Sequence, residues 1–195
     1  MRNFFVRAFC LLSVTVWLNA CGGKTETRQP TTDSTQNTEP ARTQSSADFS
    51  VTLQKILQPE RGGLLRGVNL GDAIGRVTSL ETAPLAEDST TYKGFTERLT
   101  EGIDDEFADV LYRTDAQGRV VTIHVDVFLN EQAKVDTLLA ELRRYFIQRY
   151  GAPQGMAKQI TWNLPRNGQL RLGDESVRQA PGLAIEFSGG KKALQ

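Results

Sequence analysis

Apolar and polar side chains alternate over residues 120–129, which predicts one long, half-buried strand. Its apolar side consists of Val121, Ile123, Val125, Val127 and Leu129, and its other side of Thr122, His124, Asp126 and Phe128. Further strands are predicted at residues 92–99, 107–113, 159–164, 169–172 and 183–187. The segments 114–118 and 165–168, which contain Gly with Asp or Pro, predict the turns between two pairs of these strands.

A different pattern, with apolar residues three and four positions apart, predicts a helix between Asn130 and Gly151. Asn130 is expected to cap the start of this helix, and Gly151 and Pro153 to end it. A shorter helix is predicted at residues 70–77, where Leu70, Ile74 and Val77 share this spacing. The stripe of the long helix is formed by Val135, Leu138, Leu139, Leu142, Phe146 and Tyr150.

The order of these elements predicts an α+β fold, an antiparallel sheet with helices on one face. A helix followed by three strands occurs over residues 70–129 and again over 131–187, so the fold is expected to be a tandem repeat. A single mixed antiparallel sheet without internal repetition fits the same core residues. In either arrangement residues 48–195 form one domain.

The N-terminus has the pattern of an export signal. Arg2 and Arg7 precede an apolar run, residues 8–18, that is too short to cross a bilayer. The sequence Leu18-Asn19-Ala20-Cys21 resembles the lipobox of bacterial lipoprotein precursors. That resemblance implies cleavage after residue 20 and a diacylglycerol thioether on Cys21. An ordinary cleaved signal with a free thiol and an uncleaved short anchor are the two alternatives.

Residues 22–47 predict a disordered tether behind the lipidated cysteine. They contain no large apolar side chain, and 16 of the 26 are Thr, Ser, Gln, Asn or Pro, so burial cannot offset the entropy of ordering them. Their typical reach is about 30 Å. A glycosylated stalk has a similar composition. The chain thus divides into a signal peptide (1–20), lipidated cysteine and tether (21–47) and folded domain (48–195).

The cysteine and charge counts exclude several classes of function. Of the two cysteines, Cys10 leaves with the signal and Cys21 carries lipid, so no thiol remains for a disulfide, redox pair or thiolate zinc site. Removal of Arg2 and Arg7 from 23 basic and 23 acidic residues leaves a net charge of −2, which does not favour nucleic acid as a partner. No second apolar run of 18 residues follows.

The segment Gly67–Val77 behind a lipobox resembles the short Gly-x-x-x-x-Val helix that opens small outer-membrane-assembly lipoproteins. The tandem order of helix and strands is similar to the β-lactamase-inhibitor-protein-like fold. These resemblances imply a protein-binding envelope module without enzymatic activity, and they assign no individual residue. Gly22, where sorting signals for the inner membrane have Asp, implies a position on the outer membrane facing the periplasm. Surface display and a single-membrane Gram-positive cell remain open.

Four groups of residues are candidates for a functional site. His124, the only histidine, shares a strand face with Asp126, a pair that could orient a general base in a hydrolase; an exposed polar strand position is the favoured interpretation. The acidic segment 101–106 with Asp109 could offer oxygen ligands to Ca²⁺, but a solvated turn is favoured. The segment 62–67 is interpreted as a flexible lead-in rather than a phosphate loop, and Arg143-Arg144 as solvated rather than anion-binding.

No catalytic residue, metal site or cofactor is therefore predicted, and Cys21 is the one assigned site. The leading hypothesis is a lipid-anchored, non-enzymatic module that binds an envelope protein through its sheet. A small-ligand binder, with a pocket between sheet and helix lined by Trp162 and Tyr92, is the principal alternative. A hydrolase that uses His124 and Asp126 is a third.

Overall fold

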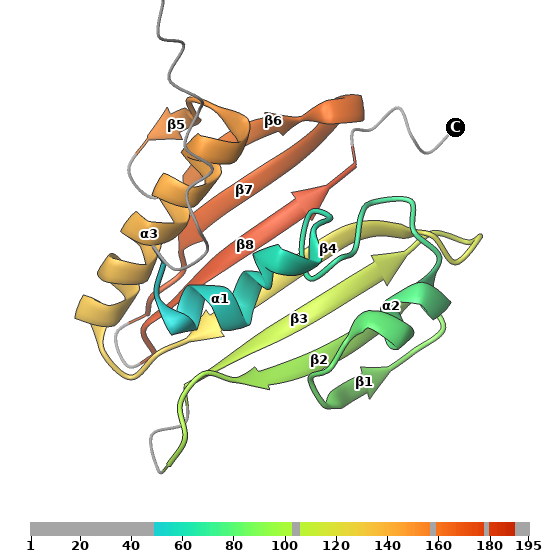
Figure 1. Cartoon of the computed structure of the whole chain (residues 1–195), viewed down its shortest axis with the longest axis horizontal. Helices are drawn as coiled ribbons and strands as arrows, with labels where there is room; N and C mark the ends of the chain where they lie inside the picture. Colours follow the sequence, from blue (N-terminus) through green and yellow to red (C-terminus); the bar gives the residue numbers. More distant parts are fainter. Residues whose placement is uncertain (1–48, 103–105, 157–158, 178–179, 190–195) are drawn as a thin grey trace, which may run out of the picture. The chain divides into compact units, whose positions relative to one another are not determined.

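The computed structural model describes residues 49–102, 106–156, 159–177 and 180–189, which form a single layer of strands and a single layer of helices (Figure 1). Neighbouring strands are antiparallel throughout, in the order β1-β2-β3-β4-β8-β7-β6-β5. The strands are β1 (Leu85–Asp88), β2 (Tyr92–Arg98), β3 (Phe107–Thr114), β4 (Val120–Phe128), β5 (Gln154–Met156), β6 (Gln159–Leu164), β7 (Gly168–Asp174) and β8 (Gly182–Ser188).

Each half of the sheet is a meander of four strands that follows a helix. The last strands of the two halves, β4 and β8, pair with each other and join the halves into one sheet. The predicted repeat is therefore present, but with four strands in each half instead of three. The missed strands, β1 and β5, lie at the two edges of the sheet. All four residues of β1 are exposed and β5 has three residues, so neither shows an alternating pattern.

Three helices pack against one face of the sheet, as the sequence predicted (Figure 1). They are α1 (Val51–Leu57), α2 (Ile74–Leu80) and α3 (Gln132–Tyr150), with short 3₁₀ turns at Pro59–Arg61 and Pro165–Asn167. The sequence analysis missed α1, whose N-cap is Ser50. The Ser50 Oγ accepts a hydrogen bond from the Leu53 N–H (3.2 Å) and donates one to Glu141 of α3 (2.5 Å).

Two predicted helix boundaries need correction. Helix α2 begins at Ile74, so Leu70 lies before it and not within it. The cap of α3 is Glu131, and neither it nor Asn130 caps the helix through its side chain. The Asn130 N–H instead donates to the Glu106 carboxylate (3.3 Å). Gly151 ends α3 as predicted, with φ of 84° and its N–H bonded to the Ile147 carbonyl (2.9 Å).

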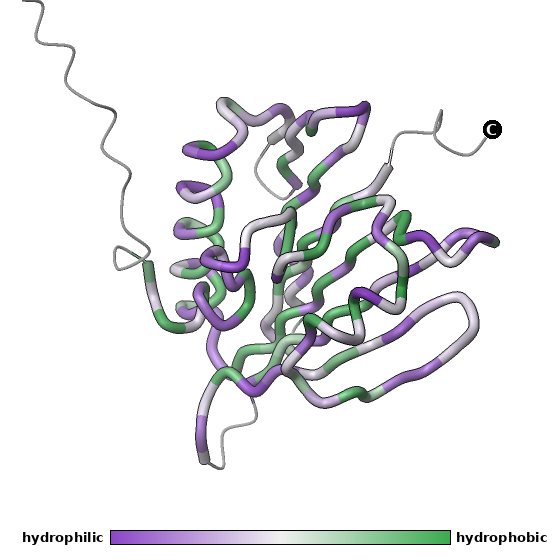
Figure 2. The backbone as a smooth tube through the Cα atoms, turned by 45° about the vertical axis from the view of Figure 1, so that its right-hand side comes forward, coloured by the Kyte–Doolittle hydropathy of each residue, from purple (hydrophilic) through white to green (hydrophobic). Residues whose placement is uncertain are grey.

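The core lies between the sheet and the helices, and hydropathy alternates along the strands that line it (Figure 2). In β4 the residues Ile123, Val125 and Val127 are buried as predicted. A register shift between β3 and β4 leaves Val121 without a paired residue in β3. Val120 is therefore buried where the alternation predicted Val121. Phe146 of α3 is completely buried against Trp162, Phe187, Tyr145 and Tyr150.

A charged cluster is also buried, in the first half of the domain. The Arg66 side chain is 0% exposed and donates to the carbonyls of Ile56 (3.0 Å) and Lys55 (2.8 Å). It pairs with Glu81 and with Glu97, each at 2.9 Å. The segment 62–67 is thus anchored in the core by Arg66, so the expectation of a flexible lead-in was wrong.

The pairing of β4 with β8 requires a glycine at position 182. A Cβ on Gly182 would lie 2.6 Å from the backbone carbonyl oxygen of Val127. We therefore expect Gly182→Ala to lower the free energy of unfolding by about 1–3 kcal/mol. The matched control is Gly75→Ala in α2, where a Cβ meets nothing within 4 Å. That change should raise the free energy of unfolding by about 0.5–1 kcal/mol. Urea titrations of both variants test the prediction, and equal stabilities would contradict it.

Candidate functional site

The face of the sheet opposite the helices carries the candidate site, and we call it the open sheet face. Because side chains alternate along a strand, the residues between the buried ones in β4 point to this face. No helix of the described chain lies over it (Figure 1). Its side chains come from six strands and are Tyr92, Thr96, Arg98, Phe107, Asp109, Leu111, Arg113, Thr122, His124, Asp126, Phe128, Gln159, Thr161, Asn163, Gln169, Arg171, Ala184, Glu186 and Ser188.

His124 lies at the centre of the open sheet face, half-buried among charged neighbours. Its Nε2 is 2.9 Å from Asp126 Oδ1, so the structure brings together the two residues that the sequence singled out. Its Nδ1 is 3.6 Å from Glu186 Oε2. The second oxygen of Glu186 accepts a hydrogen bond from Arg171 Nη2 at 2.5 Å. The result is a row of alternating charge that crosses three adjacent strands, β4, β8 and β7.

Strand register explains this row. Glu186 lies directly opposite His124 on β8, and Arg171 lies directly opposite Glu186 on β7. Opposite charges at such positions stabilise a sheet by about 0.2–1 kcal/mol per pair. The sequence analysis found Asp126 because it is two residues from His124 on the same strand. It missed Glu186 and Arg171 because no short-range pattern reveals which strands pair.

The neighbouring carboxylates raise the pKa of His124. The hydrogen bond to Asp126 is the largest contribution, and the negative charges of Asp126 and Glu186 act in the same direction. Partial burial and the Arg113 guanidinium oppose the rise. The folded structure thus stabilises the imidazolium form relative to the unfolded chain, because two carboxylates on adjacent strands face the ring.

This pKa shift predicts a pH-dependent stability. Because the folded pKa exceeds that of the unfolded chain, the contribution of His124 is complete below about pH 6.5 and is lost as the pH rises through the folded value. We expect the Tm advantage of wild type over His124→Gln to be larger at about pH 5.5 than at about pH 9. NMR titration of the single imidazole measures the pKa directly, and Asp126→Asn should lower it. A value at or below about 6.5 would contradict the prediction.

Aromatic side chains flank the charged centre of the open sheet face. At one end Phe107 and Phe128 stack with ring centroids 4.7 Å apart, and Phe128 is 37% exposed. At the other end the Arg113 guanidinium lies over the ring of Tyr92, 5.9 Å from its centroid. The face therefore combines apolar contact area at its ends with charge at its centre.

Among its described residues the acidic segment 101–106 is only partly solvated, because Glu101 is exposed whereas Glu106 is buried. Glu106 is 4% exposed and pairs with Lys134 of α3 at 2.8 Å. Asp109 lies on the open sheet face, where it accepts a hydrogen bond from Thr96 (2.6 Å). Residues 103–105 lie outside the described part of the chain. Among the described residues, no group of three or more His, Cys, Asp or Glu side chains is arranged to hold a metal ion.

Trp162 and Tyr92 do not line a common pocket, so that expectation was wrong. Trp162 is buried beneath α3, where it packs on Phe146 and donates a hydrogen bond to the Gly151 carbonyl (3.0 Å). Tyr92 belongs to β2, on the opposite face, and four strands lie between β2 and β6 in the sheet order. Alternation places them on opposite faces because Phe95, three residues after Tyr92, is buried on the helix side.

Arg143 and Arg144 line a groove of about 660 Å³ between α3 and the β5–β7 end of the sheet. The groove is open to solvent. Arg144 also lies over the ring of Phe49, 5.0 Å from its centroid. The pair therefore borders a defined hollow in addition to forming part of the polar side of α3.

The signal peptide, Cys21 and the tether lie outside the described residues. No helix in the described part of the chain is both long enough and apolar enough to cross a membrane. Comparison of the chain with protein-family models, curated proteins and solved structures finds no match.

Proposed function

We propose that this protein is a lipid-anchored protein of the bacterial cell envelope and acts as a non-enzymatic protein-interaction module. The open sheet face is its contact surface. The observation that carries this proposal is the one-sided architecture: the described helices cover one face of the sheet and leave the other uncovered. The chain is proposed to be held by Cys21 on the outer membrane, facing the periplasm.

The size of the open sheet face suits a protein partner. Six strands of about seven residues, at about 4.8 Å between strands and 3.3 Å per residue, cover on the order of 650 Å² in flat projection. A stable protein interface buries about 800 Å² on each partner, and the accessible area of a corrugated surface exceeds its projection. A partner that covers most of this face would therefore form an interface of ordinary size.

The composition of the face supports the same partner class. Interfaces are enriched in aromatic residues and arginine, and their strongest contacts come from these side chains. Phe128 supplies exposed aromatic surface at one end, and the half-buried Tyr92 lies at the other beside the Arg113 guanidinium. Arg171 supplies a guanidinium group in the central row. The charged row gives a partner a pattern to match, which favours specificity.

A hydrolase is less well supported by the geometry of His124. A general base needs one ring nitrogen free to accept the proton of a nucleophilic hydroxyl. Here Nε2 is bonded to Asp126 and Nδ1 faces Glu186, so carboxylates engage both nitrogens. The ligand-binding alternative lacks its proposed pocket, since Trp162 and Tyr92 lie on opposite faces.

Site-specific photocrosslinking in native membranes tests the contact surface. A benzoylphenylalanine at Ser188, on the open sheet face, should yield a crosslink to one defined envelope protein. The same group at Thr78, exposed on α2, is the matched control and should not. Arg171→Glu should reduce the Ser188 crosslink, because it reverses one charge of the central row. Equal crosslinking from both positions, or none from Ser188, would refute the proposed surface.

Lipidation of Cys21 has its own test. Cells grown with an alkyne analogue of palmitate should label the wild-type protein, and Cys21→Ser should abolish the label because no other cysteine follows the signal. The variant should also leave the membrane fraction, since two or three acyl chains provide lasting attachment and one chain alone is marginal. Cys10→Ser is the control and should label like wild type. Labelling of Cys21→Ser would contradict the assignment.

A further inference from the structure

Positive charge is concentrated in one segment of this chain. Residues 142–173 contain six Lys or Arg and no Asp or Glu, whereas residues 22–141 and 174–195 together hold 15 basic and 23 acidic side chains. In the structure this segment comprises the second half of α3, strands β5 and β6, and most of β7. We propose that the surface it forms, here called the basic end, docks onto an anionic phospholipid membrane. The basic end is defined by Arg143, Arg144, Arg149 and Arg166.

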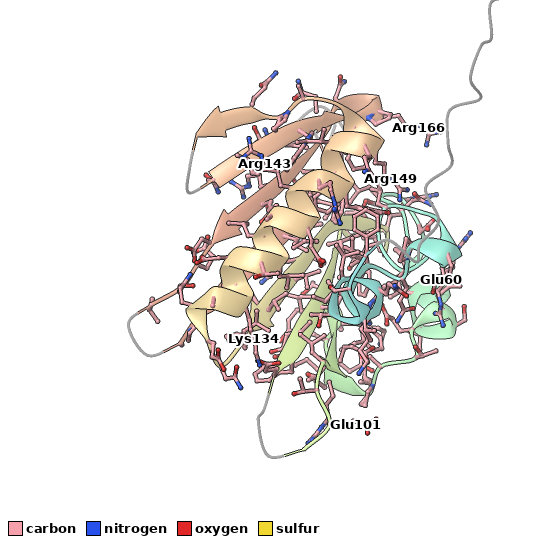
Figure 3. All side chains as sticks on the ribbon, turned by 60° about the vertical axis from the view of Figure 1, so that its left-hand side comes forward. Glu60, Glu101, Lys134, Arg143, Arg149 and Arg166 are labelled. Carbon is pink, nitrogen blue, oxygen red and sulfur yellow. The ribbon has the colours of Figure 1, made fainter. Side chains whose placement is uncertain are left out.

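These arginines are exposed, and they lie on the second half of α3 and on the β6–β7 turn. Figure 3 shows Arg143, Arg149 and Arg166 in the upper part of the domain, with Lys134 and Glu101 at the opposite end. Arg149 bonds to the Tyr145 hydroxyl (2.7 Å) and to the Gly63 carbonyl, both of them neutral groups. No carboxylate among the described residues pairs with Arg143, Arg149 or Arg166. Their positive charge is therefore presented to the surroundings.

Beside these charges the structure offers apolar surface. The groove of about 660 Å³ next to α3 is lined by Leu139, Ile160 and Leu172, with Arg143 on its wall. Ile147, 39% exposed, borders the same groove. Among the described residues that line it, Asp136 is the one with an acidic side chain, and it belongs to the first half of α3. Arginine next to exposed aliphatic surface suits the membrane interface, where anionic headgroups lie above acyl chains.

The position of Phe49, at the N-terminal end of the described fold, supports a membrane as the binding partner of the basic end. The described fold begins at Phe49, whose ring packs edge-on against Tyr145 (5.5 Å between centroids) and lies under Arg144. The N-terminal end of the described fold thus lies beside the basic end. This step rests on the proposed lipid anchor at Cys21. A tether with a reach of about 30 Å would hold the domain at high local concentration over the bilayer.

Docking in this way is compatible with the proposed partner surface. The groove and Arg143 lie on the helix side of the sheet, whereas the open sheet face lies on the other side. Contact with the bilayer through the basic end would leave the open sheet face accessible. The membrane and the partner protein would therefore use different sides of the same domain.

Vesicle binding by a chain without lipid tests this inference. Residues 22–195 include the whole compact unit, residues 43–195, and lack the signal and Cys21. This protein should sediment with vesicles of phosphatidylglycerol and phosphatidylethanolamine and should not sediment with phosphatidylcholine vesicles. Binding should weaken at least about tenfold between low salt and 0.5 M salt, because ions screen charges at a surface. Absence of binding to anionic vesicles, or equal binding to both kinds, would overturn the inference.

A charge-reversal pair identifies the surface. Arg143→Glu with Arg166→Glu should weaken binding to anionic vesicles by at least about tenfold, since each basic residue near such a surface contributes roughly a fivefold factor. The matched control, Arg76→Glu with Arg119→Glu, makes the same change in net charge on α2 and the β3–β4 turn and should bind like wild type. An equal loss in both pairs would overturn the assignment. Because these proteins carry no lipid, the result is independent of Cys21 labelling and of the Ser188 crosslink.

Discussion

Replacing Arg66 with methionine should lower the free energy of unfolding by about 3–5 kcal/mol, a loss typical of breaking a buried ion pair from one side. The Glu81 side chain is 0% exposed, and Arg66 is its charged partner at 2.9 Å. Without the guanidinium, a carboxylate would remain buried and uncompensated, and the carbonyls of Lys55 and Ile56 would lose their donor. For a domain of this size the Tm should fall by roughly 10–20 °C.

The hydroxyl of Tyr112 is a second partner of Glu81 in this cluster. Tyr112 is completely buried and donates a hydrogen bond to Glu81. Burial, followed by the charge of Glu81, raises the pKa of Tyr112 well above 10, so the phenol stays protonated and remains a donor. One donor alone does not neutralise the carboxylate. The hydrogen bonds and charges of the cluster thus depend on one another, and removing the Arg66 cation leaves Glu81 without a counter-charge.

Two variants separate this mechanism from a general effect of losing arginine. Arg61→Met removes an exposed arginine of the 3₁₀ turn Pro59–Arg61, which donates a hydrogen bond to the Leu80 carbonyl, and should cost less than about 1 kcal/mol. Adding Glu81→Gln to Arg66→Met should recover part of the stability, because the buried group is then uncharged. Chemical denaturation of wild type, Arg66→Met, Glu81→Gln and the double variant gives the coupling energy. A fully additive cycle would contradict the model of a buried ion pair.

Phe146→Ala should have an effect of similar size, about 3–5 kcal/mol, through loss of packing and not of charge. The ring is 0% exposed and contacts Trp162 and Phe187, at 5.5 and 6.1 Å between centroids. It is the point where α3 meets β6 and β8. Truncation would leave a cavity between the long helix and the second half of the sheet.

The matched control for Phe146 is its neighbour on the helix. Ile147 is exposed at the edge of the groove, so Ile147→Ala should change stability by less than about 0.5–1 kcal/mol. Phe146→Leu should give an intermediate loss, since leucine refills part of the space. Equilibrium unfolding in urea, followed by Trp fluorescence, measures all three. If Phe146→Ala cost no more than Ile147→Ala, the packing role assigned to this ring would be wrong.

The sequence analysis predicted the helices and strands with long periodic patterns correctly. The 19 residues of α3 and the nine of β4 each show several turns or repeats of their own period, so local sequence identifies them. The elements that were missed are short: α1 has seven residues, β1 four and β5 three. A better reading of Ser50 as a helix cap, with Leu53, Ile56 and Leu57 at helical spacing, could have found α1.

The sequence analysis identified two residues of the charged row, His124 and Asp126, and missed Glu186 and Arg171. His124 and Asp126 share one strand face, and the period of two along a strand is a local property. Glu186 is 62 residues further along the chain, and it meets His124 only because β4 pairs with β8 in one particular register. The burial of Arg66 could not be predicted for a similar reason. Its glycine-rich neighbours indicate a loop, and its partners Glu81 and Glu97 lie 15 and 31 residues further along the chain.

The sequence by itself determined the class of fold, the alternation of its main strands, the stripe of its long helix and the expectation of a lipid anchor, because each depends on neighbouring residues. The tertiary structure decided which strands lie side by side, which face stays uncovered, where Arg66 is buried and how the charges of β4, β8 and β7 align. Strand pairing is a contact between distant segments, chosen by the packing of the whole core, and no local period encodes it.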